Sequence, residues 1–120
     1  MKYMKVYICA PIKEKDISEK VCVALEGANH SVYWPPRDTP QDIEELKFKN
    51  NEKAIREADV FVAVLNVPGK DFAWELGYAY GLNKRIIGYV LSNEYKDSPM
   101  MRDSIKEFVP DTEDLLKSLK

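Results

Sequence analysis

The sequence predicts an α/β fold in which helices cover both faces of a mostly parallel sheet. Short apolar segments alternate along the 120 residues with segments whose apolar residues recur at helical spacing, a pattern typical of a three-layer sandwich. The run Val60–Leu65 is apolar without interruption, as expected for a strand that is covered on both faces. Because no repeat, linker or low-complexity segment interrupts the pattern, we predict a single domain over residues 1–120 with four or five strands.

Four segments have the composition of strands, and a fifth is ambiguous. The four are Lys5–Ala10, Ser31–Trp34, Val60–Leu65 and Arg85–Leu91. Val109 and Pro110 form either a short edge strand or only a turn. The segment PPRDTP, residues 35–40, follows the second strand and is predicted to be a rigid loop.

Helical periodicity and end signals predict five helices. Their ranges are 12–28, 41–58, 71–81, 99–108 and 111–120. Asp71 and Asp111 are expected N-caps. In the third helix Ala73, Gly77 and Gly81 recur every four residues. Since glycine in a helix interior costs about 1 kcal/mol relative to alanine, we interpret these residues as a face that packs closely against another element.

Composition excludes several classes of partner. A formal net charge of −2 gives no basic surface for a nucleic-acid backbone. No apolar run approaches the ~20 residues that span a membrane, and the N-terminal segment is interpreted as a first strand rather than a signal peptide. Cys9 and Cys22 lack metal-ligand spacing and are predicted to be reduced core residues of a cytoplasmic protein. His30 is the only histidine, which argues against a Ser-His-Asp triad or a His-based zinc site.

Glu75 is the leading candidate for chemistry. It lies in the first turns of the helix after Val60–Leu65, at the sheet edge where ligands bind in open parallel sheets, between Trp74 and Leu76. Apolar neighbours disfavour the ionised carboxylate, whereas a helix N-terminus favours it. An ionised carboxylate in a mostly apolar pocket is a nucleophile or a general base. On spacing alone, a plainer role as a helix cap or lysine partner is favoured.

The segment WELGYAYGLNKRII, which follows ADVFVAVLN, resembles the nucleoside 2-deoxyribosyltransferase superfamily, including the related 2'-deoxynucleoside 5'-monophosphate N-hydrolases. The similarity covers most of residues 5–103. It implies a flavodoxin-like strand order with the first and third strands adjacent at the centre. It also implies that Glu75 is the nucleophile that attacks the anomeric carbon, that Tyr7 reaches this glutamate, and that no metal or organic cofactor is needed.

The resemblance also places residues around a nucleoside or nucleotide substrate. The loop after the first strand, with Ala10, Pro11 and Lys13, corresponds to the loop that holds the 5'-phosphate in the hydrolases. A lysine near a helix N-terminus retains the ability to bind phosphate, although a solvated lysine is the plainer interpretation. Trp34 is interpreted either as an aromatic that stacks on the base or as a core residue.

A further part of the predicted site lies near the C-terminus. Ser98 and Met100 belong to a segment that, in the family, reaches the active site of the neighbouring subunit. The resemblance therefore implies a homodimer or a larger homo-oligomer with a shared site. Ser98 matches the phosphate-binding version of this segment, and a helix N-cap is its alternative role.

Besides Pro11 and Lys13, which replace the serine and arginine expected in the phosphate-binding loop, two further positions depart from the family pattern. Asn51, eight residues before Asp59, stands where the family has an aspartate that assists proton transfer to the leaving base, and an amide is not a general acid. Gly69 stands where the transferases have an aspartate that binds the sugar hydroxyl and the hydrolases a serine that binds phosphate. Asp71 and Lys70 are nearby substitutes, although neither is in register.

The sequence leaves three candidate functions for this protein. The first is cleavage of the N-glycosidic bond of a 2'-deoxynucleoside or its 5'-monophosphate through a covalent intermediate on Glu75, with transfer to another nucleobase or, in a hydrolase, to water. The second is a nucleotide-binding or sensing module that kept the pocket and lost the chemistry. The third, a response-regulator-like receiver domain, lacks support because PIKEK rather than an acidic pair follows the first strand.

Overall fold

The computed structural model describes residues 3–120 and contains a five-stranded sheet. The strands are β1 (Lys5–Cys9), β2 (Ser31–Tyr33), β3 (Val60–Leu65), β4 (Arg85–Val90) and β5 (Glu107–Val109). All neighbouring pairs are parallel, and the strand order is β2-β1-β3-β4-β5. This is the flavodoxin-like order, so the predicted α/β fold is confirmed, including the adjacency of β1 and β3.

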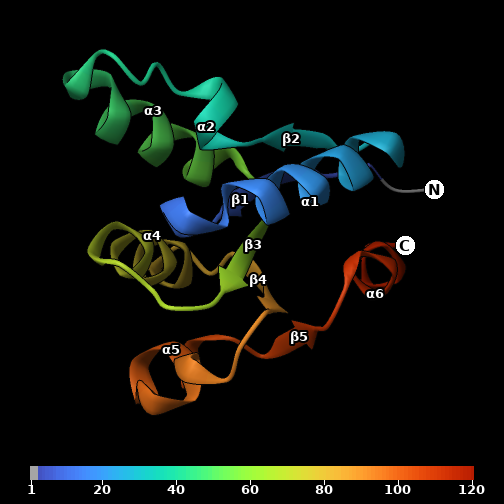
Figure 1. Ribbon diagram of the computed structural model, residues 1–120. Helices are drawn as coiled ribbons and strands as arrows, with labels where there is room; N and C mark the ends of the chain where they lie inside the picture. The colour runs from blue at the N-terminus through green and yellow to red at the C-terminus, as the bar shows by residue number, and fades with distance from the viewer. Residues whose placement is uncertain (1–2) are drawn as a thin grey trace.

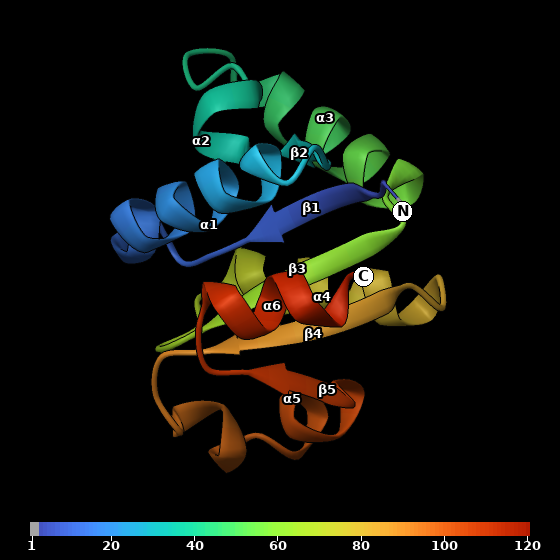
Figure 2. The same cartoon turned by 90° about the vertical axis from the view of Figure 1, so that its right-hand side faces the viewer.

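Helices cover both faces of this sheet. They are α1 (Lys15–Gly27), α2 (Pro35–Asp38), α3 (Glu44–Glu57), α4 (Lys70–Gly81), α5 (Pro99–Ser104) and α6 (Thr112–Ser118), with 3₁₀ turns η1 (Ile12–Glu14) and η2 (Glu94–Asp97). In Figure 1, α3, α4 and α5 lie on one side of the strands. Turned by 90° in Figure 2, α1 and α6 lie in front of the strands and α4 behind them. The arrangement is the three-layer sandwich that the alternating pattern predicts.

Each face of the sheet has its own buried core. Because successive residues of a strand point to opposite faces, Val6 and Ile8 of β1 pack in the core formed with α1 and α6, which also contains Leu25. Tyr7 and Cys9 pack in the core formed with α3 and α4. Tyr7 and Cys9, which precede the sheet's carboxyl edge on β1, therefore face α3 and α4, whereas Ile8 faces α1 and α6.

We expect Leu25→Ala to lower the free energy of unfolding by about 2–5 kcal/mol, because Leu25 is fully buried and its loss leaves a cavity. The exposed neighbour Val23 on the same helix provides the control, since Val23→Ala should change stability by less than about 0.5 kcal/mol. Urea unfolding of both variants measures the difference. Equal losses in the two variants would contradict this assignment of the core.

The segment after β2 is not the predicted rigid loop, because residues 35–38 form the short helix α2. Proline is favoured in the first turn of a helix, where its missing N–H is not needed. The Asp38 carboxylate also accepts a hydrogen bond from the Trp34 backbone N–H at 2.8 Å. The next helix begins at Glu44 rather than Gln41. The predicted helix 12–28 likewise opens as the 3₁₀ turn η1 before α1.

The predicted helix 99–108 is too long. Helix α5 ends at Ser104, and residues 107–109 form β5, which pairs with residues 87–89 of β4. The edge-strand alternative is thus confirmed, with the strand beginning earlier than predicted and ending before Pro110. Pairing with β4 overrides the local helical pattern, as tertiary context commonly does.

Two predictions about α4 are wrong. The helix begins at Lys70 with Gly69 at the N-cap position, so Asp71 lies in the first turn and is not the cap. The small-residue face does not pack closely within the chain, because a Cβ added at Gly77 or Gly81 would meet no atom within 4 Å. Helix α4 buries its other side against the sheet.

Several further local expectations are confirmed, among them the N-cap alternative for Ser98. Ser98 and Asp111 cap α5 and α6, each accepting a hydrogen bond from a backbone N–H in the first turn. Cys9 and Cys22 are both free and buried. Within residues 3–120, no helix combines the length and the hydrophobicity that crossing a membrane requires.

Candidate active site

A cavity of about 400 Å³ lies at the carboxyl edge of the sheet. The end of β1, the first residues of α1, the segment from α2 to α3, and the start of α4 form its walls. Six of the predicted site residues line it: Ala10, Pro11, Trp34, Asn51, Asp71 and Glu75. The cavity therefore occupies the place where ligands bind in open parallel sheets.

Glu75 is held by donors from two other elements. The Tyr7 hydroxyl on β1 donates to Glu75 Oε1 at 2.8 Å, and the Asn51 Nδ2 amide on α3 donates to Glu75 Oε2 at 3.3 Å. The three predicted catalytic residues thus meet around one carboxylate. Their catalytic roles stay predictions.

The surroundings of the Glu75 carboxylate disfavour its ionised form, and the hydrogen bonds that it accepts offset part of this effect. Burial raises the pKa of Glu75, and the charge of Asp71 raises it further, whereas the hydrogen bonds from Tyr7 and Asn51 lower it. Burial, followed by the negative charge of Glu75, raises the pKa of the Tyr7 hydroxyl. The same causes raise the pKa of the Cys9 thiol. Tyr7 and Cys9 therefore stay neutral beside the glutamate.

Trp34 forms a wall of the cavity and also belongs to the core. It is only 6% exposed, and its indole Nε1 donates to the buried Ser18 Oγ at 2.9 Å. The pairing holds the indole plane in one orientation. Trp34 is therefore a core residue, which is one of its two predicted roles, and part of its side chain also lines the cavity.

Five polar residues that the sequence analysis did not select also line the cavity: Lys15, Ser18, Thr39, Gln41 and Lys47. Lys47 lies one helical turn before Asn51, so helical spacing alone predicts that both share a face. Thr39 is 3% exposed, and its Oγ1 donates to Asn51 Oδ1 at 2.6 Å. This contact joins two segments that local spacing does not relate, so the sequence carries no signal for it.

Four predicted substrate-binding residues do not line the cavity. Lys13 and Gly69 are exposed, and Lys15 brings a lysine to the cavity wall instead. Ser98 is occupied as the cap of α5, and Met100 is 83% exposed. Lys13 and Gly69 therefore do not contribute to the cavity wall, and a role of Ser98 and Met100 in the site of a neighbouring subunit stays a prediction.

Among residues 3–120, no group of three or more histidine, cysteine, aspartate or glutamate side chains is arranged to hold a metal ion. The cavity instead combines the half-buried carboxylate of Glu75, the exposed carboxylate of Asp71, neutral donors and two lysines. This set of side chains can bind a polar organic molecule and attack it as a nucleophile.

Solved structures of low sequence identity share the fold. The 2-deoxyribosyltransferase of the psychrotolerant bacterium Bacillus psychrosaccharolyticus has a TM-score of 0.82 at 24% identity, with 92% of this chain and 89% of that chain covered. The CMP N-glycosidase of Clostridium botulinum has a TM-score of 0.71 at 22% identity, with 96% of both chains covered. A CheY-like receiver domain of Methanospirillum hungatei JF-1 has a TM-score of 0.66 at 14% identity, with 98% and 90% covered. These identities establish a common fold alone.

The sequence itself matches a family model. No curated protein matches the chain, but the model of the nucleoside 2-deoxyribosyltransferases matches residues 6–112. That range extends from β1 into α6 and contains Tyr7, Asn51 and Glu75. The chain therefore belongs to the nucleoside 2-deoxyribosyltransferase family.

Proposed function

We propose that this protein cleaves the N-glycosidic bond of 2'-deoxynucleosides or their 5'-monophosphates and transfers the deoxyribosyl group to another nucleobase. The observation that carries the proposal is the Glu75 carboxylate, which lines a cavity of about 400 Å³ and accepts hydrogen bonds from Tyr7 and Asn51. A cavity of this size matches the common volume of small-molecule sites. Family membership supports the reaction class.

The reaction proceeds by two displacements at the anomeric carbon. A Glu75 oxygen forms a bond to this carbon while the carbon–nitrogen bond breaks, and the base leaves with the electron pair. A nitrogen of the acceptor base then forms a new bond to the carbon and releases its proton to solvent, while the ester bond to Glu75 breaks and its electron pair returns to the carboxylate. Two inversions retain the configuration of the sugar. The reaction needs no metal or organic cofactor.

The Tyr7 hydroxyl orients Glu75 by donating to Oε1. Asn51 donates its amide hydrogen but supplies no proton to the departing base. The base therefore leaves as an anion or takes its proton from another donor. Bases that leave readily are the preferred substrates.

The first test is a chromatographic assay of free base released from deoxynucleosides and their 5'-monophosphates, each with and without an added acceptor base. Exchange of one base for another is the result expected of a transferase. Release without exchange, strongest with monophosphates, indicates instead a 2'-deoxynucleoside 5'-monophosphate N-hydrolase. Lys15 and Lys47 favour this alternative, because two lysines on the cavity wall attract a phosphate.

A second candidate function is a nucleotide-binding or sensing module without turnover. Asn51 and Gly69, which replace residues that the family uses in the reaction, favour it. This function predicts that a nucleotide raises the melting temperature while no base is released over long incubation. Base release from any compound of the panel excludes it.

We expect the activity to fall as the pH decreases through a range above that of an ordinary glutamate. Burial raises the pKa of Glu75, and only the ionised carboxylate attacks the sugar, so activity requires a pH above this raised value. The pH profile of kcat/KM measures it. Asp71→Asn removes a charge that raises this pKa, so the acid limb of the profile should move to lower pH in that variant. An acid limb at the ordinary glutamate value would contradict the prediction.

We also propose a cytoplasmic homodimer or larger homo-oligomer with a shared site. Met100 is exposed and lies outside its own chain's cavity, as expected if it contacts a second copy. Phe48 of α3 and Trp74 of α4 are also exposed, and their rings are in mutual contact with centroids 5.3 Å apart. Light scattering measures the oligomeric state. A monomer that is fully active, with Met100→Ala unchanged, would contradict the shared site.

A further inference from the structure

A chain of hydrogen bonds leads from β2 to the Glu75 carboxylate. The Tyr33 hydroxyl lies 2.7 Å from Thr39 Oγ1. Thr39 Oγ1 lies 2.6 Å from Asn51 Oδ1, and Asn51 Nδ2 lies 3.3 Å from Glu75 Oε2. These hydrogen bonds connect Tyr33 on β2, Thr39 after α2, Asn51 on α3 and Glu75 on α4.

The direction of every donor in this chain follows from the ionised Glu75. The carboxylate only accepts, so the Asn51 amide must direct its NH₂ group towards it. Asn51 Oδ1 then faces Thr39 and only accepts, so the single hydroxyl hydrogen of Thr39 is donated to it. Thr39 has no second hydrogen, and Tyr33 must therefore be the donor in the remaining contact.

Aromatic stacking links Tyr33, at the far end of these hydrogen bonds, back to Tyr7 beside Glu75. The Tyr33 ring stacks on the Tyr7 ring with centroids 5.7 Å apart and an interplanar angle of 8°. The Tyr7 hydroxyl in turn donates to Glu75 Oε1 at 2.8 Å. Both oxygens of the carboxylate are therefore connected to Tyr33, one through hydrogen bonds and one through the ring of Tyr7.

We propose that Thr39 and Tyr33 are positioning residues that hold the Asn51 amide with its NH₂ group towards Glu75 and thereby keep the nucleophile ionised and oriented. Without the Thr39 hydroxyl, the amide is free to turn and to present Oδ1 to the carboxylate, which disfavours the charge. The inference rests on the proposed role of Glu75 as the nucleophile. It assigns a function to two residues that do not contact the carboxylate themselves.

The critical variant is Thr39→Val, which keeps the shape of the side chain and removes the hydroxyl. We expect kcat to fall by up to about tenfold, the usual consequence of losing one hydrogen bond between neutral groups, with KM changed less than about twofold. The acid limb of the pH profile should move to higher pH. Thr39→Ser, which retains the hydroxyl, should restore both quantities.

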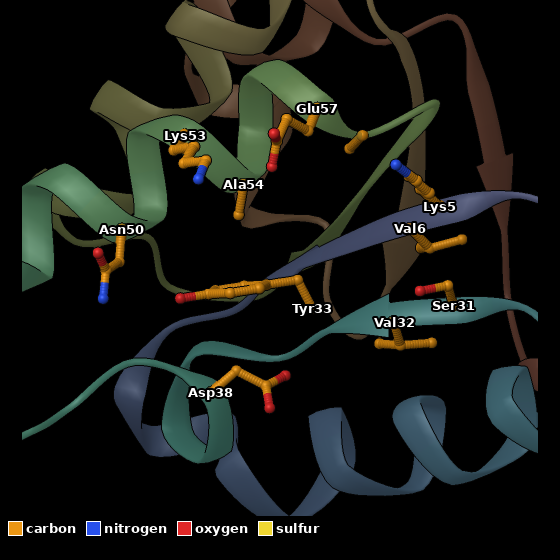
Figure 3. Close-up of a pocket in the computed structure, with 11 residues that line it drawn as sticks. Lys5, Val6, Ser31, Val32, Tyr33, Asp38, Asn50, Lys53, Ala54 and Glu57 are labelled. Carbon is orange, nitrogen blue, oxygen red and sulfur yellow. The ribbon is translucent and has the colours of Figure 1, made fainter.

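Tyr33→Phe separates the hydroxyl of Tyr33 from its ring. It retains the stacking on Tyr7 and leaves Thr39 its own hydrogen to donate, so its effect should have the same direction as Thr39→Val and be smaller. Figure 3 shows the Tyr33 ring beside a groove of about 410 Å³, which Lys53 of α3 also lines. Lys53→Ala is the matched control, because it alters this groove without touching the hydrogen-bond chain, and it should leave kcat and the pH profile unchanged.

The groups that face Glu75 are the same in all these variants, so a displaced acid limb reports the orientation of Asn51. They are Tyr7 and Cys9 on β1 and Asp71 on α4, with Lys15 and Lys47 on the same cavity wall.

A double-mutant cycle tests whether Thr39 acts through Asn51. In the Asn51→Ala background, Thr39→Val should cause no further loss of kcat. An equal loss in both backgrounds, or a lower melting temperature with an unchanged pH profile, would show that Thr39 has only a structural role and would overturn the proposal.

A measurement without turnover separates this inference from the proposed function. Titration of ¹³C-labelled glutamate, with the Glu75 signal assigned by Glu75→Gln, gives the pKa of the carboxyl directly. A higher pKa of Glu75 in Thr39→Val than in the wild type supports the positioning role even if the protein releases no base. An identical pKa in both proteins overturns it, whether or not the wild type is active.

Discussion

Glu75→Ala is expected to abolish turnover, with a loss of at least about 10³-fold in kcat, because the variant lacks the oxygen that forms the bond to the sugar. No other carboxylate accepts the hydrogen bonds of both Tyr7 and Asn51 among residues 3–120. Base release from the best substrate of the panel measures the effect. Turnover equal to that of the wild type would exclude the covalent mechanism.

The fold should persist in the isosteric variant Glu75→Gln, which serves as the control for structure. Burial raises the pKa of Glu75 in the folded protein, so the protonated form is favoured there. The stability contributed by this group is fully present below its unfolded-state pKa and is lost as the pH rises through the folded-state pKa. Thermal melts should therefore show that the Tm of Glu75→Gln relative to the wild type increases with pH. A difference that is independent of pH would contradict the raised pKa.

Asn51→Asp should increase the release of poorly leaving bases by about 10²–10⁴-fold, the usual contribution of a general acid. The new carboxyl would stand where Asn51 Nδ2 now lies 3.3 Å from Glu75 Oε2. Two carboxylates at this distance do not both ionise readily, so one retains a proton at a higher pH than usual. The introduced carboxyl is the group that can pass this proton to the departing base.

The dependence on the leaving base makes this prediction specific. The measurement is kcat/KM for a series of substrates whose bases leave with increasing ease. Asn51→Asp should exceed the wild type for bases that leave poorly, and the two proteins should have similar values for bases that leave readily. Asn50→Asp is the control, because Asn50 lies next to Asn51 on α3 but lines the outer groove instead of the cavity. An equal gain in both variants, or no gain for any base, would contradict the role of position 51.

The resemblance seen in the sequence identified the residues at the centre of the site. The uninterrupted apolar run Val60–Leu65 indicated a strand covered on both faces, and all six residues are buried. The family resemblance pointed to Tyr7 and Asn51, which donate hydrogen bonds to the Glu75 carboxylate. The buried strand is accessible to sequence reasoning because its burial pattern is a property of a single segment, whereas Tyr7 and Asn51 lie on other elements and required the resemblance.

Patterns within single segments predict the fold class and place Glu75 at the carboxyl edge of the sheet, and the family resemblance predicts the strand order. The hydrogen bond from Thr39 to the Asn51 amide, and the presence of Lys15 and Lys47 but not Gly69 in the cavity wall, become visible only in the folded chain. A strand or helix is specified by its own residues, whereas a hydrogen bond between separate segments depends on how the elements cross and which rotamers packing permits. The cavity chemistry arises from such contacts between β1, β2, α3 and α4.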